Sequence, residues 1–182
     1  MQNVDSKGLF DVLAAYESDS LSHAVDVATP SDAQAVWSGI GFRLRDFYLV
    51  TELGSVAEII TMPTVTRVPG SVNWLYGVAN IRGTLMSTVD LGLFFFDERT
   101  RLSKRSRVLA VGHEHGYFGL LVDEVYGLRH FEPSDEVNDD RQISDPALDD
   151  FMTREYQRAG QHWAVFDLGK LAQHAAFLHA AA

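Results

Sequence analysis

Two histidines are candidate metal ligands. His113 and His115 are separated by one residue, a spacing that places two imidazoles on the same side of a strand. However, they lie between Gly112 and Gly116, which is typical of an exposed hairpin tip, and no third ligand stands at a standard zinc spacing. We therefore expect an exposed turn and no metal site.

Asp123 and Glu124 form a carboxylate pair, the composition of a general acid and base. Neighbouring residues of a strand point to opposite faces, so the two carboxylates cannot meet at one substrate. The sequence also lacks cysteine, a G-x-S-x-G elbow, an H-E-x-x-H helix and a phosphate-binding G-x-x-x-x-G-K-[S/T] loop. We interpret the pair as structural and expect neither catalytic residues nor a cofactor. An active site assembled from distant residues stays open as an alternative.

One segment combines an arginine with aromatic residues at a turn. Asn80 and Gly83 suit the backbone of a hairpin turn, and Arg82 projects from it. Trp74 and Tyr76 lie just upstream, so we expect the arginine beside aromatic rings, which is the composition of an interface anchor. From composition alone, a plain hairpin with a solvated arginine is an equal alternative.

The elements that carry these residues are predicted to be mainly β-strands. Alternating apolar residues predict strands on both sides of turns at Asp46 and 80–83, and a further hairpin over 108–122. Helices are few. We expect a short one after Asp90 and a longer one over 168–178, where apolar residues follow helical spacing.

The sequence repeats itself at an offset of 77 residues. Asp90-Leu91-Gly92 corresponds to Asp167-Leu168-Gly169, and in each copy the aspartate can cap a helix. The second copy has Ala159 at the position of Arg82, so the arginine-bearing turn is unique. Closing a small sheet removes its exposed edges, so we expect two five-stranded barrels packed together.

Composition and charge restrict the class of protein. The 182 residues carry 25 acids and 15 bases, and the acids gather in residues 1–34 and 132–155. An acidic chain without a basic stripe is a poor nucleic-acid ligand. No apolar run reaches the roughly 18 residues of a membrane-spanning helix, and no signal peptide is evident. We expect a cytoplasmic protein, with an acidic tail over 1–36 and a folded domain over 37–178.

The order of the motifs resembles the CheW family of chemotaxis coupling proteins. Its members carry a Pro-Gly, a Gly-Val-x-Asn-x-Arg-Gly turn and a strand that ends in Asp-Leu. Here these motifs are Pro69-Gly70, Gly77–Gly83 and Val89-Asp90-Leu91. Val56-Ala57-Glu58-Ile59 is similar to the family's Val-x-Glu-Ile, and Gly119–Val125 to its Gly-Leu-x-Val-Asp-x-Val.

The resemblance covers about residues 38–178 and implies two SH3-like five-stranded β-barrels with a C-terminal helix. It implies a non-catalytic adaptor that links methyl-accepting chemoreceptors to a CheA-like histidine kinase, recruited to membrane-associated receptor arrays without inserting into the membrane. One barrel face would bind the regulatory domain of the kinase, and a groove at the barrel junction would bind the receptor tip. The implied partner-binding residues are Val56, Glu58, Gly77, Asn80, Arg82 and Gly83.

Within the family, the long tail and the segments 37–42 and 122–131 resemble the PilI branch, which serves type IV pili and twitching motility. The chain departs from the family at Ser87 and Thr88, where a proline and an apolar residue are usual. Two other functions stay open, a small-molecule sensor and a hydrolase. A five-stranded barrel is too narrow to hold much ligand, which disfavours the sensor.

Overall fold

The computed structural model describes residues 36–113, 116–138 and 141–177. Nearly all of the predicted tail and His115 of the histidine pair lie outside the described residues. The described part contains the strands β1 Trp37–Leu44, β2 Phe47–Glu52, β3 Glu58–Thr61, β4 Leu75–Ile81, β5 Thr84–Asp90, β6 Arg107–His113, β7 Gly116–Val122, β8 Glu124–Phe131, β9 Met152–Arg158 and β10 Gln161–Phe166. Its named helical segments are α2 Leu91–Phe96, α3 Leu168–Gln173 and the short 3-10 turns η1 Leu53–Ser55, η2 Pro133–Asp135 and η3 Asp149–Phe151. Residues 175–177 are also helical.

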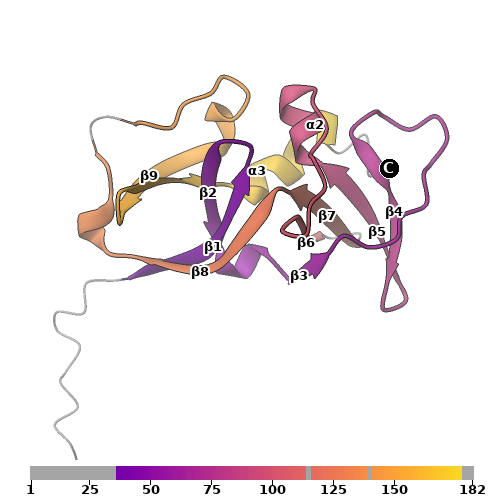
Figure 1. Cartoon of the computed structure of the whole chain (residues 1–182), viewed down its shortest axis with the longest axis horizontal. Helices are drawn as coiled ribbons and strands as arrows, with labels where there is room; N and C mark the ends of the chain where they lie inside the picture. Colours follow the sequence, from indigo (N-terminus) through magenta and orange to yellow (C-terminus); the bar gives the residue numbers. More distant parts are fainter. Residues whose placement is uncertain (1–35, 114–115, 139–140, 178–182) are drawn as a thin grey trace, which may run out of the picture. The chain divides into compact units, whose positions relative to one another are not determined.

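The strands form two five-stranded sheets (Figure 1). The first sheet has the order β8-β1-β2-β10-β9, and the second has the order β3-β6-β7-β5-β4. Each sheet is antiparallel except for one parallel contact, β2 with β10 in the first and β5 with β7 in the second. The predicted mainly β class, with two five-stranded units and a C-terminal helix, is confirmed.

The internal repeat is visible in the elements. β4, β5 and α2 begin 77 residues before β9, β10 and α3. The repeats are exchanged between the sheets, because β9 and β10 of the second copy join β1 and β2, while β4 and β5 join β6 and β7. In Figure 1 the indigo strands β1 and β2 therefore share a sheet with the orange β8 and the yellow β9. Neither half of the chain can complete a sheet alone.

The alternation of side chains along the strands separates three apolar clusters. In β10, Ala164 and Phe166 face the main cluster, which takes residues from both sheets, whereas Trp163 and Val165 face a second cluster within the first sheet. A third cluster, around Met86, belongs to the second sheet alone. Each sheet thus has a small core of its own, and the main cluster joins them.

Both predicted helices form, and each begins at its aspartate. The Asp90 carboxylate accepts a hydrogen bond from Leu93 N at 3.2 Å, and the Asp167 carboxylate accepts one from Lys170 N at 3.0 Å. The prediction of one continuous helix over 168–178 is wrong, because α3 ends at Gln173 and His174 has extended backbone (φ −68°, ψ 127°).

The break in the C-terminal helix accompanies an aromatic contact. Beyond His174, the buried Phe177 ring stacks on Trp74 at 6.1 Å and meets Phe118 edge-on at 5.1 Å. Helical spacing alone carries no information about this contact. Among the described residues, no helix combines the length and the apolar character needed to cross a bilayer.

Candidate functional site

The β4–β5 hairpin turns through Arg82 and Gly83, both in the left-handed region with φ of 52° and 88°. Positive φ at two successive residues is the geometry of a type I′ turn, which suits the twist of a hairpin. The Asn80 side-chain oxygen accepts a hydrogen bond from Gly83 N at 2.9 Å and holds the turn closed. The predicted turn is therefore present, with Asn80 at the end of the strand. Ala159 and Gly160 form the equivalent turn between β9 and β10.

The arginine of this turn forms an ion pair with a residue of another strand. Arg82 Nη2 lies 2.7 Å from Glu58 Oε1 at the start of β3. The side chains are 79% and 35% exposed, so the pair contributes at most about 1 kcal/mol to stability. Both residues were candidates from the sequence, but nothing in it indicated that they meet.

A groove of about 300 Å³ opens beside this ion pair. Its floor includes the buried residues Met86 and Ala110, and the exposed ring of Tyr117 stands at its edge. The lining residues are Ala57, Glu58, Ile81, Arg82, Thr84, Met86, Ala110 and Tyr117. An apolar floor beneath a polar edge is the anatomy of a protein interface. Sequence reasoning missed Tyr117, whose signal is an aromatic residue directly after the hairpin tip.

The two aromatic residues expected beside Arg82 both pack against apolar clusters. Trp74 packs against the main cluster, where its ring contacts Phe94 at 5.0 Å. Tyr76 packs against the third cluster. Burial of large apolar rings outweighs their closeness to Arg82 in sequence. The expectation that Trp74 flanks an exposed arginine is therefore wrong, and Tyr117 is the aromatic residue that lines the groove.

Two other candidate residues, Gly77 and Val56, are buried or partly buried. Gly77 has φ of 152°, and a Cβ atom there would lie 2.7 Å from the Thr66 carbonyl oxygen. The absence of a side chain allows Thr66 to exchange two backbone hydrogen bonds of 2.8 Å with Val78. Val56 follows η1 and packs, partly buried, against the main cluster.

The carboxylates of Asp123 and Glu124 have separate partners, as their alternation along the chain predicts. Asp123 Oδ2 accepts a hydrogen bond from Arg45 N at 2.6 Å. Glu124 lies 3.7 Å from the Arg43 guanidinium and 3.5 Å from that of Arg105. Within the described ranges, no group of three or more His, Cys, Asp or Glu side chains could hold a metal ion.

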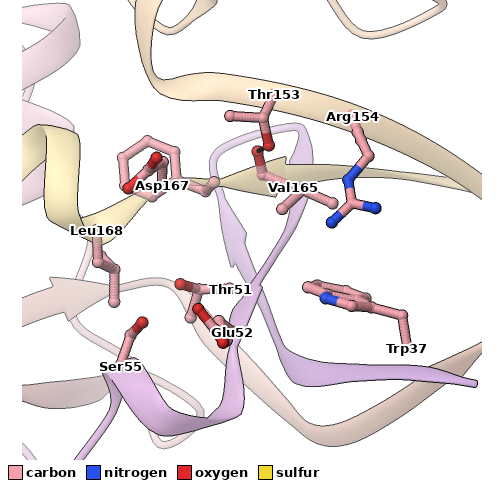
Figure 2. A pocket seen from close by; sticks show the side chains of 10 residues that line it. Trp37, Thr51, Glu52, Ser55, Thr153, Arg154, Val165, Asp167 and Leu168 are labelled. Carbon is pink, nitrogen blue, oxygen red and sulfur yellow. Dashed lines mark hydrogen bonds between the residues drawn. The ribbon is translucent and has the colours of Figure 1, made fainter.

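A second hollow, of about 200 Å³, lies on the first sheet. Figure 2 shows the Arg154 guanidinium above the Trp37 ring, with its Cζ 5.9 Å from the ring centre. The lining residues are Trp37, Thr51, Glu52, Ser55, Thr153, Arg154, Val165, Phe166, Asp167 and Leu168. These include hydroxyls and carboxylates but no imidazole.

Two tyrosines near this sheet have perturbed ionisation. Burial raises the pKa of Tyr156. Burial also raises the pKa of Tyr126, and the hydrogen bond to Tyr48 and the charge of Glu124 raise it further. Both phenols therefore stay protonated at neutral pH, and neither can serve as a general base there.

Comparison with known proteins assigns the described domain to a family. The CheW-like domain family matches residues 38–176. Protein PilI of Pseudomonas aeruginosa is 41% identical over 154 residues, which cover 84% of this chain and 85% of that protein. The chemotaxis protein CheW of Helicobacter pylori is 30% identical over 94 residues, covering 52% of this chain and 57% of that protein.

A solved structure gives the same assignment at the level of the fold. The crystal structure of the scaffolding protein TtCheW from Thermoanaerobacter tengcongensis superposes with a TM-score of 0.64 at 19% identity. The match covers 76% of this chain and 94% of that one.

Proposed function

Since the chain belongs to the CheW-like domain family, we propose that it is a non-catalytic adaptor that couples methyl-accepting chemoreceptors to a CheA-like histidine kinase. The family match over residues 38–176 and the 41% identity to PilI support this function. An adaptor acts by holding two partners in a fixed geometry, so its mechanism lies in its interfaces. Coupling requires that one partner binds with different strength in the kinase-on and kinase-off states.

The observation that carries the proposal is the groove beside the Glu58–Arg82 ion pair. Its apolar floor and charged edge suit a folded protein partner, and we assign it to the regulatory domain of the kinase. Arg82 and Glu58 contact the partner, while Asn80 and Gly83 hold the turn that presents Arg82. Val56 and Gly77 contribute indirectly, by positioning the strands around the groove.

The receptor tip binds at the junction of the two sheets. η1 leads from β2 of the first sheet to β3 of the second, and its Leu53 is 48% exposed. An exposed leucine where the chain passes from one sheet to the other offers an apolar contact for a helical partner. Binding there leaves the Glu58–Arg82 groove for the kinase, as a coupling protein requires.

The relationship to PilI supports type IV pili and twitching motility as the output of the system. The protein then acts in the cytoplasm, where it is recruited to membrane-associated receptor arrays by its partners and not by insertion of its own chain.

A sedimentation assay of receptor–adaptor–kinase complexes tests this function. We expect Arg82→Ala to fold with an unchanged melting temperature and to lose about thirtyfold in affinity for the kinase, the loss typical of an interface anchor. Glu58→Lys should also weaken assembly, because it places two cations side by side. The matched control is Arg158→Ala, which removes another exposed, ion-paired arginine from the first sheet.

Wild-type assembly by both Arg82→Ala and Glu58→Lys would contradict the assignment of the groove. Failure of the wild-type protein to sediment with receptor and kinase would contradict the adaptor function itself.

A further inference from the structure

The segment that connects α2 to β6 is strongly basic in an otherwise acidic chain. Between Arg99 and Arg107, here called the basic loop, there are five cations and no acid. The net charge of the whole chain is −10. Acidic residues on either side of the loop offset its positive charge when the net charge is summed over longer segments.

A buried carboxylate fixes the start of the basic loop. Asp90, which is almost fully buried, accepts hydrogen bonds from Thr100 N at 3.1 Å and from Thr100 Oγ1 at 2.7 Å. The same carboxylate caps α2 through Leu93 N. Gly92 makes room for this arrangement, since a Cβ atom there would lie 2.8 Å from Thr100 Oγ1.

Serine hydroxyls and an arginine fix the end of the loop. The buried Ser106 hydroxyl accepts a hydrogen bond from Ser103 N at 2.9 Å, and Ser106 N donates to Ser103 O at 3.2 Å. Arg107 folds back and donates to the carbonyl oxygens of Lys104 and Ser106, both at 2.8 Å. The backbone is thus held by its own hydrogen bonds, so a partner need not order it on binding.

The fixed loop displays cations around an exposed apolar side chain. Leu102 is 51% exposed. Arg99, Arg101, Lys104 and Arg105 are all exposed as well. Of these four, only Arg105 lies within ion-pair distance of a described carboxylate, at 3.5 Å from Glu124. Arg99, Arg101 and Lys104 form no ion pair with a carboxylate of the described residues.

We propose that the basic loop is a docking site for an acidic segment of a partner polypeptide, with Leu102 as its apolar anchor. Arginine presents a planar fork of donors that matches a carboxylate, so two or three Asp or Glu side chains could be bound at once. An apolar residue surrounded by charge is the arrangement of a small interface core and its rim. The basic loop shares no residue with the lining of the Glu58–Arg82 groove.

The acidic residues near the loop favour a polypeptide as its partner over an extended polyanion such as a nucleic acid. Asp97 and Glu98 directly precede the loop, and Glu124 lies beside Arg105. A nucleic acid or an anionic membrane presents closely spaced negative charges over a wide surface and would meet these acids and the net charge of −10. A short acidic segment needs to contact only the loop.

Fluorescence anisotropy with a labelled acidic peptide that has leucine at its centre tests the proposal. We expect the full chain to bind the peptide, with an affinity that falls as salt rises. The double variant Arg101→Glu/Lys104→Glu should lose about tenfold or more, because two attractive contacts become repulsive. Leu102→Ser should lose roughly threefold to tenfold through its apolar contact alone.

The matched controls are Arg67→Glu and Val68→Ser, which alter an exposed cation and an adjacent exposed apolar residue elsewhere in the chain. Unchanged binding by the double variant, equal weakening by Arg67→Glu, or no binding by the wild-type chain at low salt would each overturn the proposal. Tighter binding of phosphatidylglycerol vesicles or duplex DNA through the same loop residues would show that the partner class is wrong.

Discussion

At the scale of single residues, burial of a polar side chain is expected to destabilise the fold at Thr88 and to stabilise it at Glu155. Thr88 is fully buried in β5, opposite Gly119, and its hydroxyl has no hydrogen-bond partner among the described residues. Glu155 is also buried, but its carboxylate accepts hydrogen bonds from Gln142 N at 3.0 Å and Ile143 N at 3.1 Å and contacts His162 Nδ1 at 2.6 Å.

The unpaired hydroxyl predicts a stabilising substitution. Thr88→Val keeps the shape of the side chain and removes a buried polar group, so it should raise the free energy of unfolding by about 1 kcal/mol. Equilibrium urea denaturation measures the change. The control is Thr84→Val, at an exposed position of the same strand, which should change stability by less than about 0.5 kcal/mol. A destabilised Thr88→Val protein would show that the hydroxyl has a partner after all.

Removal of the buried Glu155 carboxylate is expected to destabilise the protein. Glu155→Ala leaves two backbone N–H groups and an imidazole without their acceptor, so it should lower the free energy of unfolding by about 3 kcal/mol. Glu52→Ala, which removes an exposed carboxylate, should stay within about 0.5 kcal/mol of wild type. Urea denaturation compares the two, and a loss below about 1 kcal/mol for Glu155→Ala would contradict the role of its hydrogen bonds.

At the scale of elements, the two equivalent hairpins have the same turn geometry but differ in whether the turn carries an arginine. The β4–β5 and β9–β10 turns share positive φ at both central residues, but only the first carries an arginine. Their shared geometry explains why Gly83 and Gly160 recur at an offset of 77 residues.

This pair of turns gives a matched prediction. Gly83 and Gly160 have φ of 88° and 77° and open space around them, so alanine at either position should cost about 1 kcal/mol of stability through backbone strain alone. Only Gly83→Ala should also weaken kinase binding in the sedimentation assay, because only that turn presents Arg82. Equal loss of binding by Gly160→Ala would mean that the assay reports stability and not the interface.

At the scale of the whole molecule, the exchange of hairpins between the sheets predicts one cooperative unit. β2 and β5 of the first half have their parallel partners, β10 and β7, in the second half. The main apolar cluster also takes residues from both sheets, so unfolding one sheet exposes the core of the other.

The full chain should therefore unfold in a single transition, with tryptophan fluorescence and far-ultraviolet circular dichroism changing together. A fragment of residues 36–98 has β1 to β5 and α2 but neither β7 nor β10, and it should show no cooperative transition. Two separate transitions in the full chain, or a folded fragment, would mean that the sheets are independent domains.

Features set by neighbouring residues could be predicted from the sequence by itself. The strands beside the turns at Asp46 and 80–83, the hairpin over 108–122, the caps at Asp90 and Asp167 and the repeat follow from alternation, turn chemistry and capping. The strands β3 and β8 were not predicted. The motif order was also sufficient to predict the family. These signals are local, so they survive without knowledge of what packs against them.

Only the tertiary structure decided which distant segments meet. The exchange of hairpins, the pairing of Glu58 with Arg82, the burial of Trp74 and the break at His174 each depend on contacts between residues far apart in the sequence. Such contacts form because they increase the apolar area that the complete core buries. That area depends on residues far apart in the sequence, so a local pattern cannot predict it. The groove that we assign to the kinase arises from such contacts. Glu58 begins β3, Arg82 lies in the β4–β5 turn, and the floor residues Met86 and Ala110 come from β5 and β6.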